Sequence, residues 1–231
     1  DGKFGKALQL GTSPKAMSVA GLADEMKAAT ISFWVRPRLE TEQAIINNDF
    51  WAGDVNLRIN GRRLVLYSSN LDHRGLPGIP TDEFWGGRVL GLGEWNHVVF
   101  VYDLANKRAR FYLDGILDAE TPFAGTHALA LNRQFWVGAN ETNTGLWFEG
   151  DLDDLRIYDA SLTSDEIERL HGGGEGDFDS RNPSIESEPS LAGWIPDDPE
   201  MTRAIHDRTP LLVQAADSPA GRAIGQLAAR L

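Results

Sequence analysis

The stretch Trp95–Tyr102, WNHVVFVY, is the longest apolar run of the chain and is rich in β-branched and aromatic residues. It is too short to cross a bilayer, and its composition is typical of a strand that is buried on both faces. We therefore expect a central strand here. A chain of 231 residues can bury one full-sized hydrophobic core around such a strand, so we expect a single sandwich with an appendage.

Shorter strands are predicted on both sides of this run. Ile31–Val35 alternates along the chain and ends before Pro37, which suits the end of a strand. Two hairpins are expected around Asn60-Gly61 and Asp114-Gly115, because these dipeptides tolerate the positive φ angles of two-residue turns. The further predicted strands are Val55–Ile59, Arg62–Tyr67, Arg108–Leu113, Ile116–Glu120, Phe135–Gly138 and Leu152–Tyr158. This pattern predicts an all-β sandwich.

A short helix is expected only after the last of these strands. Thr163 and Glu166 form a capping box, Ile167 and Leu170 share one face, and Gly172 is a suitable C-terminal stop. Beyond it the composition changes to Gly, Pro, Ser and acidic residues. We therefore divide the chain into a sandwich domain over residues 1–171, a linker over 172–200, and a C-terminal extension with short helices over 201–231, which could serve as an assembly or docking segment.

The charge of the chain excludes several classes of function. With 22 basic and 34 acidic residues the formal charge is −12, and residues 140–200 hold 17 acidic residues against three basic ones. Nucleic acid is therefore not expected as a partner. The acidic region either binds a hard cation such as calcium or is a solvated surface. The absence of cysteine excludes disulfides and thiolate chemistry, and no apolar run is long enough for a membrane span.

Six blocks of the sequence occur in a characteristic order: GKALQL (5–10), ISFWVRP (31–37), GEWNHVVFVYD (93–103), FYLDG (111–115), FWVGAN (135–140) and FEGDLDDLRIYDASLTSDEI (148–167). Together they resemble a known family, the laminin-G-like, concanavalin A-like jelly-roll modules of bacterial surface and secreted proteins. The resemblance covers roughly residues 3 to 170 and is most specific in its last block. It implies two curved antiparallel sheets and a non-catalytic, extracellular module that binds carbohydrate, acts in adhesion or serves as a spacer, often with a structural calcium ion.

The chain departs from this family in two places. Only four residues precede the GKALQL block, so the first family strand is missing and we expect an open sheet edge, filled by Leu211–Val213 or by a neighbouring subunit. After that block, Lys15 stands in the neighbourhood where many members carry an acidic pair for calcium. The apolar alternation slips at Asp153-Asp154, which predicts a β-bulge, and Asp153 is our candidate metal ligand.

The candidate ligand site lies in two polar, Gly-containing segments that each carry a tryptophan. Trp51 and Trp85 could form an aromatic platform rimmed by hydrogen-bonding side chains; the alternative is loops anchored by their own aromatic residues. Trp34, Trp95 and Trp136 instead lie within strand patterns and are interpreted as sheet packing, as is His97. The polar candidates around the platform are Asn47, Asn48, Asp49, Asp54 and Asp82.

Three hypotheses for the function follow. The first is a non-catalytic extracellular recognition module that binds a polysaccharide or a protein partner. The second is a structural subunit of a surface layer, filament or particle, assembled through the open edge and residues 172–231. The third is a glycoside hydrolase using Glu149, Asp151 and Asp153, which share one face of a predicted strand; the resemblance favours a non-catalytic module over this third hypothesis.

Overall fold

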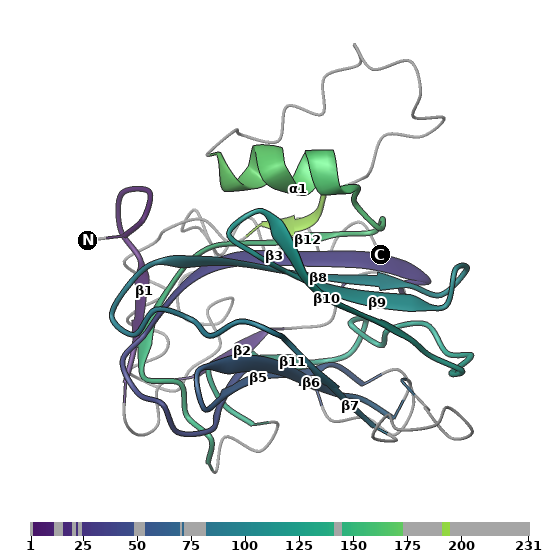
Figure 1. Ribbon diagram of the computed structural model, residues 1–231. Coiled ribbons are helices and arrows are strands. Elements are labelled where there is room, and N and C mark those ends of the chain that lie inside the picture. Colours follow the sequence, from purple (N-terminus) through teal and green to yellow (C-terminus); the bar gives the residue numbers. More distant parts are fainter. Residues whose placement is uncertain are drawn as a thin grey trace.

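The protein is a sandwich of two antiparallel β-sheets with one short helix on its outside (Figure 1). The computed structural model describes residues 2–11, 16–19, 22, 25–48, 54–69, 71, 82–140, 145–172 and the backbone of 191–194. The all-β sandwich of two antiparallel sheets with a helix after the last predicted strand is confirmed. The predicted extension over 201–231, including Leu211–Val213, lies outside the described residues.

Sheet A has the strand order β1–β12–β3–β8–β9–β10, and β13 also pairs with β12. Its central strands β3 and β8 pair antiparallel over eight positions, from Ala28 opposite Asp103 to Val35 opposite Asn96. The strands of sheet A are β1 (Leu8–Leu10), β3 (Ala28–Pro37), β8 (Asn96–Asp103), β9 (Arg108–Leu113), β10 (Ile116–Pro122), β12 (Gly150–Tyr158) and β13 (Leu191–Trp194).

Sheet B has the order β2–β11–β4–β5–β6–β7 and lies below sheet A in Figure 1. Because the two sheets face each other, every second residue of each strand points into the core between them. The strands of sheet B are β2 (Met17–Val19), β4 (Gln43–Asn47), β5 (Asn56–Asn60), β6 (Arg63–Tyr67), β7 (Glu83–Trp85) and β11 (Phe135–Val137).

Strand β8 is buried along its whole length, as the run WNHVVFVY predicts. Val98, Phe100 and Tyr102 belong to the core between the sheets, whereas Val99 and Val101 belong to a second apolar cluster on the outer face of sheet A. Helix α1 (Ser164–His171) covers this outer cluster, on the side of sheet A away from sheet B (Figure 1). Sheet A is thus buried on both faces near its centre.

Helix α1 begins and packs as its sequence predicts. The backbone amide of Thr163 donates to Glu166 Oε2 at 2.6 Å, and the amide of Glu166 donates to Thr163 Oγ1 at 3.4 Å, which completes the capping box. Ile167 and Leu170 are buried on sheet A, and burying each such side chain contributes about 1.5–3 kcal/mol. Tyr112 Oη lies 3.1 Å from Ser164 Oγ and fixes the first turn over β9.

The two predicted hairpins are present, but the first turn is shifted by one residue. Asn60 pairs with Arg63, so the turn residues are Gly61 and Arg62, with φ of 55° and 65°, and the prediction of Asn60-Gly61 is wrong by one position. Tertiary contacts hold Arg62 in this unfavourable region: its amide carbonyl accepts from Leu90 N at 2.8 Å, and its Nε donates to Leu90 O at 3.0 Å. The second turn is Asp114-Gly115, as predicted.

The edge of sheet A at β12 is shared by two short strands. Strand β1 pairs with Gly150–Leu152, and β13 pairs with residues 156–158. Between these halves the register shifts, and Asp154 has a φ of 51°, so the predicted bulge at Asp153-Asp154 is confirmed. Strand β13 lies within residues 172–200, which the composition predicts to be a linker. No periodicity in the sequence indicates a strand there.

A buried aromatic cluster joins the end of α1 to sheet A. Trp34 is 2% exposed, and its ring stacks on His171 with a centroid distance of 5.4 Å and lies 5.0 Å from the ring of His97. His97 Nε2 lies 2.9 Å from Ser32 Oγ, whereas His97 Nδ1 and Trp34 Nε1 have no hydrogen-bond partner within the described part of the chain. Burial, with smaller effects of His171, Arg156 and Lys3, lowers the pKa of His97 to about 3.

This burial predicts a loss of stability in mild acid. His97 stays neutral in the folded protein down to about pH 3 but gains a proton near pH 6.5 when unfolded, so the unfolded state binds more protons between these values. As the pH is lowered below 6.5, the contribution of His97 should therefore reduce the free energy of unfolding by about 1.4 kcal/mol per pH unit. Urea unfolding of the parent and of His97→Gln between pH 4 and 7 measures it. Equal pH slopes for the two proteins would contradict the prediction.

Candidate functional site

The outer face of sheet B carries a row of polar and aromatic side chains that runs across its strands. Because Leu57, Leu66 and Phe84 point into the core, their chain neighbours point outward. The register places these neighbours directly opposite one another on consecutive strands. In order from β2 to β7, the row consists of Ser18, Trp136, Asn47, Asn56, Tyr67 and Glu83.

Arg58 organises the middle of this face. Its Nε donates to Asn56 Oδ1 at 2.6 Å, its Nη1 donates to Glu42 Oε1 at 2.7 Å, and its guanidinium carbon lies 4.8 Å from the ring centre of Tyr67. Partial burial and the nearby Glu42 and Glu83 raise the pKa of the Tyr67 hydroxyl above its ordinary value. The phenol therefore stays protonated and can both donate and accept hydrogen bonds.

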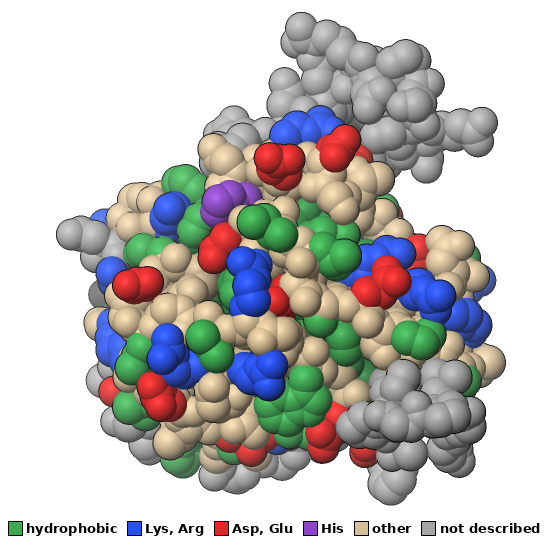
Figure 2. All heavy atoms as spheres, viewed as in Figure 1, with side chains coloured by type: hydrophobic (Ala, Val, Ile, Leu, Met, Phe, Trp, Pro, Cys, Tyr) green, Lys and Arg blue, Asp and Glu red, His purple; other side chains and the backbone are tan. Residues whose placement is uncertain are grey.

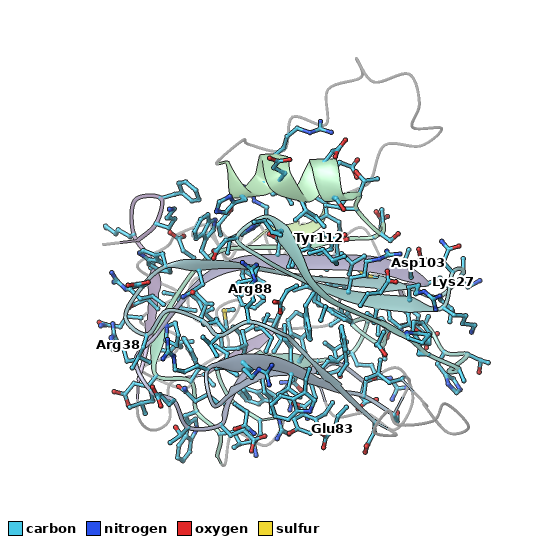
Figure 3. All side chains as sticks on the ribbon, viewed as in Figure 1. Lys27, Arg38, Glu83, Arg88, Asp103 and Tyr112 are labelled. Atoms are coloured by element: carbon cyan, nitrogen blue, oxygen red, sulfur yellow. The ribbon has the colours of Figure 1, made fainter. Side chains whose placement is uncertain are left out.

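The predicted site residue Trp85 lies on this face, at the β7 edge. It sits opposite Val65, next to the row, and its Nε1 donates to Glu83 Oε2 at 2.8 Å. Figure 3 shows Glu83 on the lower side of sheet B, away from sheet A. Trp85, Tyr67 and Trp136 are each only partly buried, so this face offers three aromatic rings to solvent.

Asn47, another predicted site residue, lies in the same row, beside Trp136. Its side chain is fully buried, and neither its Nδ2 nor its Oδ1 has a hydrogen-bond partner among the residues that the structure describes. Leaving a buried donor or acceptor unpaired costs about 1–3 kcal/mol. Three strand spacings, about 14 Å, separate β4 from β7, so Asn47 and Trp85 share the face without touching.

Asp54, another predicted site residue, lies in the connection that precedes β5. Asp54 Oδ1 accepts from the amide of Ser69 at 3.0 Å and from Ser69 Oγ at 2.7 Å, while Ser68 Oγ donates to the Asp54 carbonyl at 2.7 Å. Burial raises the pKa of the Asp54 carboxyl, and the hydrogen bonds from Ser69 and Ser68 oppose this effect. Asp54 thus ties the β4–β5 connection to the end of β6.

Asp82 and Asn48 also form hydrogen bonds that connect these segments. The amide of Ser68 donates to the Asp82 carbonyl at 3.0 Å, and Asn48 Nδ2 donates to the Ala130 carbonyl at 2.9 Å. The remaining candidates, Asp49 and Trp51, lie outside the described residues, and their role in a ligand site stays a prediction. The sequence analysis missed Tyr67 and Arg58, which only the strand register brings beside Trp85.

The metal candidate Asp153 takes part in contacts within the described part of the chain. Asp153 Oδ2 accepts from the amide of Phe4 at 2.9 Å, and the neighbouring Asp154 pairs with Arg156 at 2.7 Å. Calcium takes six to eight oxygen ligands. The described residues contain no group of three or more His, Cys, Asp or Glu side chains placed to hold a metal. Calcium binding, including a role of Asp153 in it, stays a prediction.

The acidic residues of the glycosidase hypothesis are engaged in structural contacts. Both carboxylate oxygens of Asp151 accept from arginines, with Arg36 Nε at 2.9 Å and Arg38 Nη2 at 2.6 and 2.8 Å. The amide of Glu149 donates to Gln43 Oε1 at 2.7 Å, which links β12 to sheet B. These bonds hold the first half of β12 in place.

The chain thus folds as a two-sheet antiparallel sandwich in which α1 covers one outer face and the other carries polar and aromatic side chains. The chain belongs to the concanavalin A-like lectin/glucanases superfamily, whose Laminin_G_3 family model matches residues 11–168. The resemblance found in the sequence is therefore confirmed. No curated protein matches the chain.

Solved structures of the same fold include several carbohydrate-related domains. A proposed carbohydrate binding protein from Bacteroides ovatus has a TM-score of 0.60 and 14% identity over 81% of this chain, which spans 50% of that protein. Domain 4 of AbnA, an extracellular arabinanase from Geobacillus stearothermophilus, in complex with arabinotriose, has a TM-score of 0.56 and 24% identity over 74% of this chain and 79% of its own. The CBM40 of a Ruminococcus gnavus sialidase, bound to α2,3 sialyllactose, has a TM-score of 0.53 and 14% identity over 73% of this chain and 96% of its own. At these identities the likeness shows the fold.

The contacts of Asp54 predict a structural effect of its removal. Asp54→Ala removes the acceptor of the Ser69 amide and hydroxyl at the end of β6, so the free energy of unfolding should fall by about 0.5–1.5 kcal/mol with an unchanged dependence on denaturant. Asp159→Ala removes an exposed carboxylate and serves as the control. Equal midpoints of urea unfolding for the two variants would show that Asp54 does not support these loops.

Proposed function

We propose that the protein is a non-catalytic, extracellular carbohydrate-binding module whose recognition face is the outer face of sheet B. The observation that carries this proposal is the row of aromatic and polar side chains across sheet B, on the side of the sandwich away from α1. Aromatic rings present flat apolar surfaces to sugar rings, while amides, carboxylates and guanidinium groups bind hydroxyls. The family and the carbohydrate-bound structures of the same fold support this choice.

The dimensions of the row favour an oligosaccharide over a single sugar. Four strand spacings, about 19 Å, separate β11 from β7, and Trp136 and Trp85 lie on these two strands. The ion pair of Arg58 with Glu42 and the hydrogen bond of Trp85 to Glu83 hold the side chains between them in fixed positions. Such preorganised groups lose little entropy when a ligand binds.

The charge pattern supports a polysaccharide over a nucleic acid as the partner. The face seen in Figure 2 carries basic side chains interspersed with acidic ones, in place of the continuous basic stripe that phosphate binding requires. No helix in the described part of the chain has the length and apolar character needed to cross a membrane.

A non-catalytic role is supported by the positions of the perturbed carboxyl groups. Glycosidases use two carboxyl groups that face each other across the scissile bond. In the described residues, the carboxyl groups with raised pKa values are those of Asp54 and Asp154, both raised by burial. Asp54 lies at the loop end of sheet B and Asp154 on β12 of sheet A, so they do not face one site.

Variants of the proposed face test the function. Trp85→Ala and Tyr67→Ala each remove one stacking surface, and each should weaken binding of the best-bound oligosaccharide by about tenfold or more, since 1.4 kcal/mol corresponds to a factor of ten. A glycan array with the full chain identifies that oligosaccharide, and isothermal titration measures the affinities. Ile116→Ala, an exposed apolar residue of sheet A, is the control. Unchanged affinity in both aromatic variants would show that the outer face of sheet B is not the binding face.

A second candidate function, a structural subunit, is favoured by strand β13. This strand contributes backbone pairing to only one half of the β12 edge, and residues 173–190 separate it from the end of α1. Strand exchange between identical chains is an economical route to self-association. The same edge can therefore accept residues 191–194 of a second copy.

Self-association through β13 is tested by a proline in that strand. Gly193→Pro blocks antiparallel pairing with Ile157, because proline has no amide hydrogen and fits poorly inside a sheet. Light scattering over a range of concentrations should show oligomers of the parent chain and fewer of this variant, with Gly174→Pro unchanged. A parent chain that is monomeric at every concentration would contradict the assembly role.

A further inference from the structure

A compact group of charged and aromatic side chains lies on the outer face of sheet A, next to Trp34. Arg36 of β3 pairs in register with Asp151 of β12, and Arg38 follows β3 directly. Trp95 precedes β8, and the guanidinium carbon of Arg36 lies 4.8 Å from the centre of its ring. None of these contacts belongs to the recognition face on sheet B.

Asp151 holds the two guanidinium groups in fixed orientations. Its side chain is 5% exposed, and its oxygens accept from Arg36 Nε at 2.9 Å and from Arg38 Nη2 at 2.6 Å. A buried carboxylate with such short, charge-assisted bonds positions its partners firmly. The two guanidinium groups thus share one buried carboxylate.

Arg38 has donors that this arrangement leaves available. Its Nη2 serves Asp151, which is its acidic partner in the described part of the chain, and its Nε and Nη1 make no hydrogen bond there. The side chain is 35% exposed, and Figure 3 shows Arg38 at the rim of the sandwich, pointing away from both sheets. A guanidinium group presents these donors as a planar fork that matches the two oxygens of a carboxylate.

We propose that Arg38, backed by Asp151 and flanked by Arg36 and Trp95, binds the carboxylate of an acidic saccharide such as a hexuronate. This inference rests on the proposed carbohydrate-binding function and adds a second, charge-selective site to it. The ligand carboxylate accepts hydrogen bonds from the remaining donors of Arg38, and the indole of Trp95, beside Arg36, provides an apolar surface for the sugar ring. The module then distinguishes acidic from neutral polysaccharides.

The test compares matched ligands on the full chain. Methyl glucuronide and methyl glucoside differ only at the carboxylate, and acetate supplies a carboxylate without a sugar. Titrations followed by NMR should show methyl glucuronide binding at least tenfold more tightly than either other ligand, and more weakly as salt is raised. Equal affinity for methyl glucuronide and methyl glucoside, or for methyl glucuronide and acetate, would overturn the inference.

Variants assign the preference to Arg38. Arg38→Gln removes the charge, and Arg38→Lys keeps the charge but removes the fork; both should lose at least tenfold of the affinity for methyl glucuronide. Arg108→Gln, a similarly exposed arginine paired with Glu120, should keep it. Wild-type affinity for methyl glucuronide in both Arg38 variants overturns this inference. If an oligosaccharide still binds in a Trp85-dependent manner, the proposed function stands. If the parent chain binds no saccharide at all, the proposed function is overturned as well.

Discussion

Strand β8 in the middle of sheet A is apolar on both sides, so each of its faces must be covered, and this constraint determines the architecture. Phe33 and Phe100 point into the space between the sheets, where sheet B covers them, whereas Val99 and Val101 point outward. Helix α1 covers the outward side through Ile167 and Leu170. Removing this apolar area from water is the main favourable contribution to folding, so sheet B and α1 are both required parts of one fold.

The same requirement is why we propose the outer face of sheet B for recognition. Of the four sheet faces, two form the core and one lies under α1, so the row from Trp136 to Glu83 is where polar and aromatic groups can gather without disturbing the packing. Rigid strands fix the spacing of this row, and the ion pair of Arg58 with Glu42 fixes its orientation. Positioning by a packed scaffold is what lets a flat surface bind selectively.

Local sequence signals predicted the elements well, and non-local pairing explains most of what they missed. The run WNHVVFVY, the capping box at Thr163 and the turn at Asp114-Gly115 each depend on neighbours in the chain, and each was correctly predicted. The turn at Gly61-Arg62 was misplaced because contacts of Arg62 with Leu90 select its conformation. Tyr67 and Arg58 were missed as site residues because only strand register places them beside Trp85, and β13 was missed because its partner lies more than thirty residues away.

The central claim is that sheet B presents the recognition face while α1 closes sheet A. Backbone NMR of the full chain, titrated with the neutral oligosaccharide that binds most tightly on the array, tests it most directly. The account predicts that shift changes concentrate on amides of β4, β5, β6, β7 and β11, with those of α1 and β8 unaffected. Changes confined to α1 and the outer side of sheet A would contradict it.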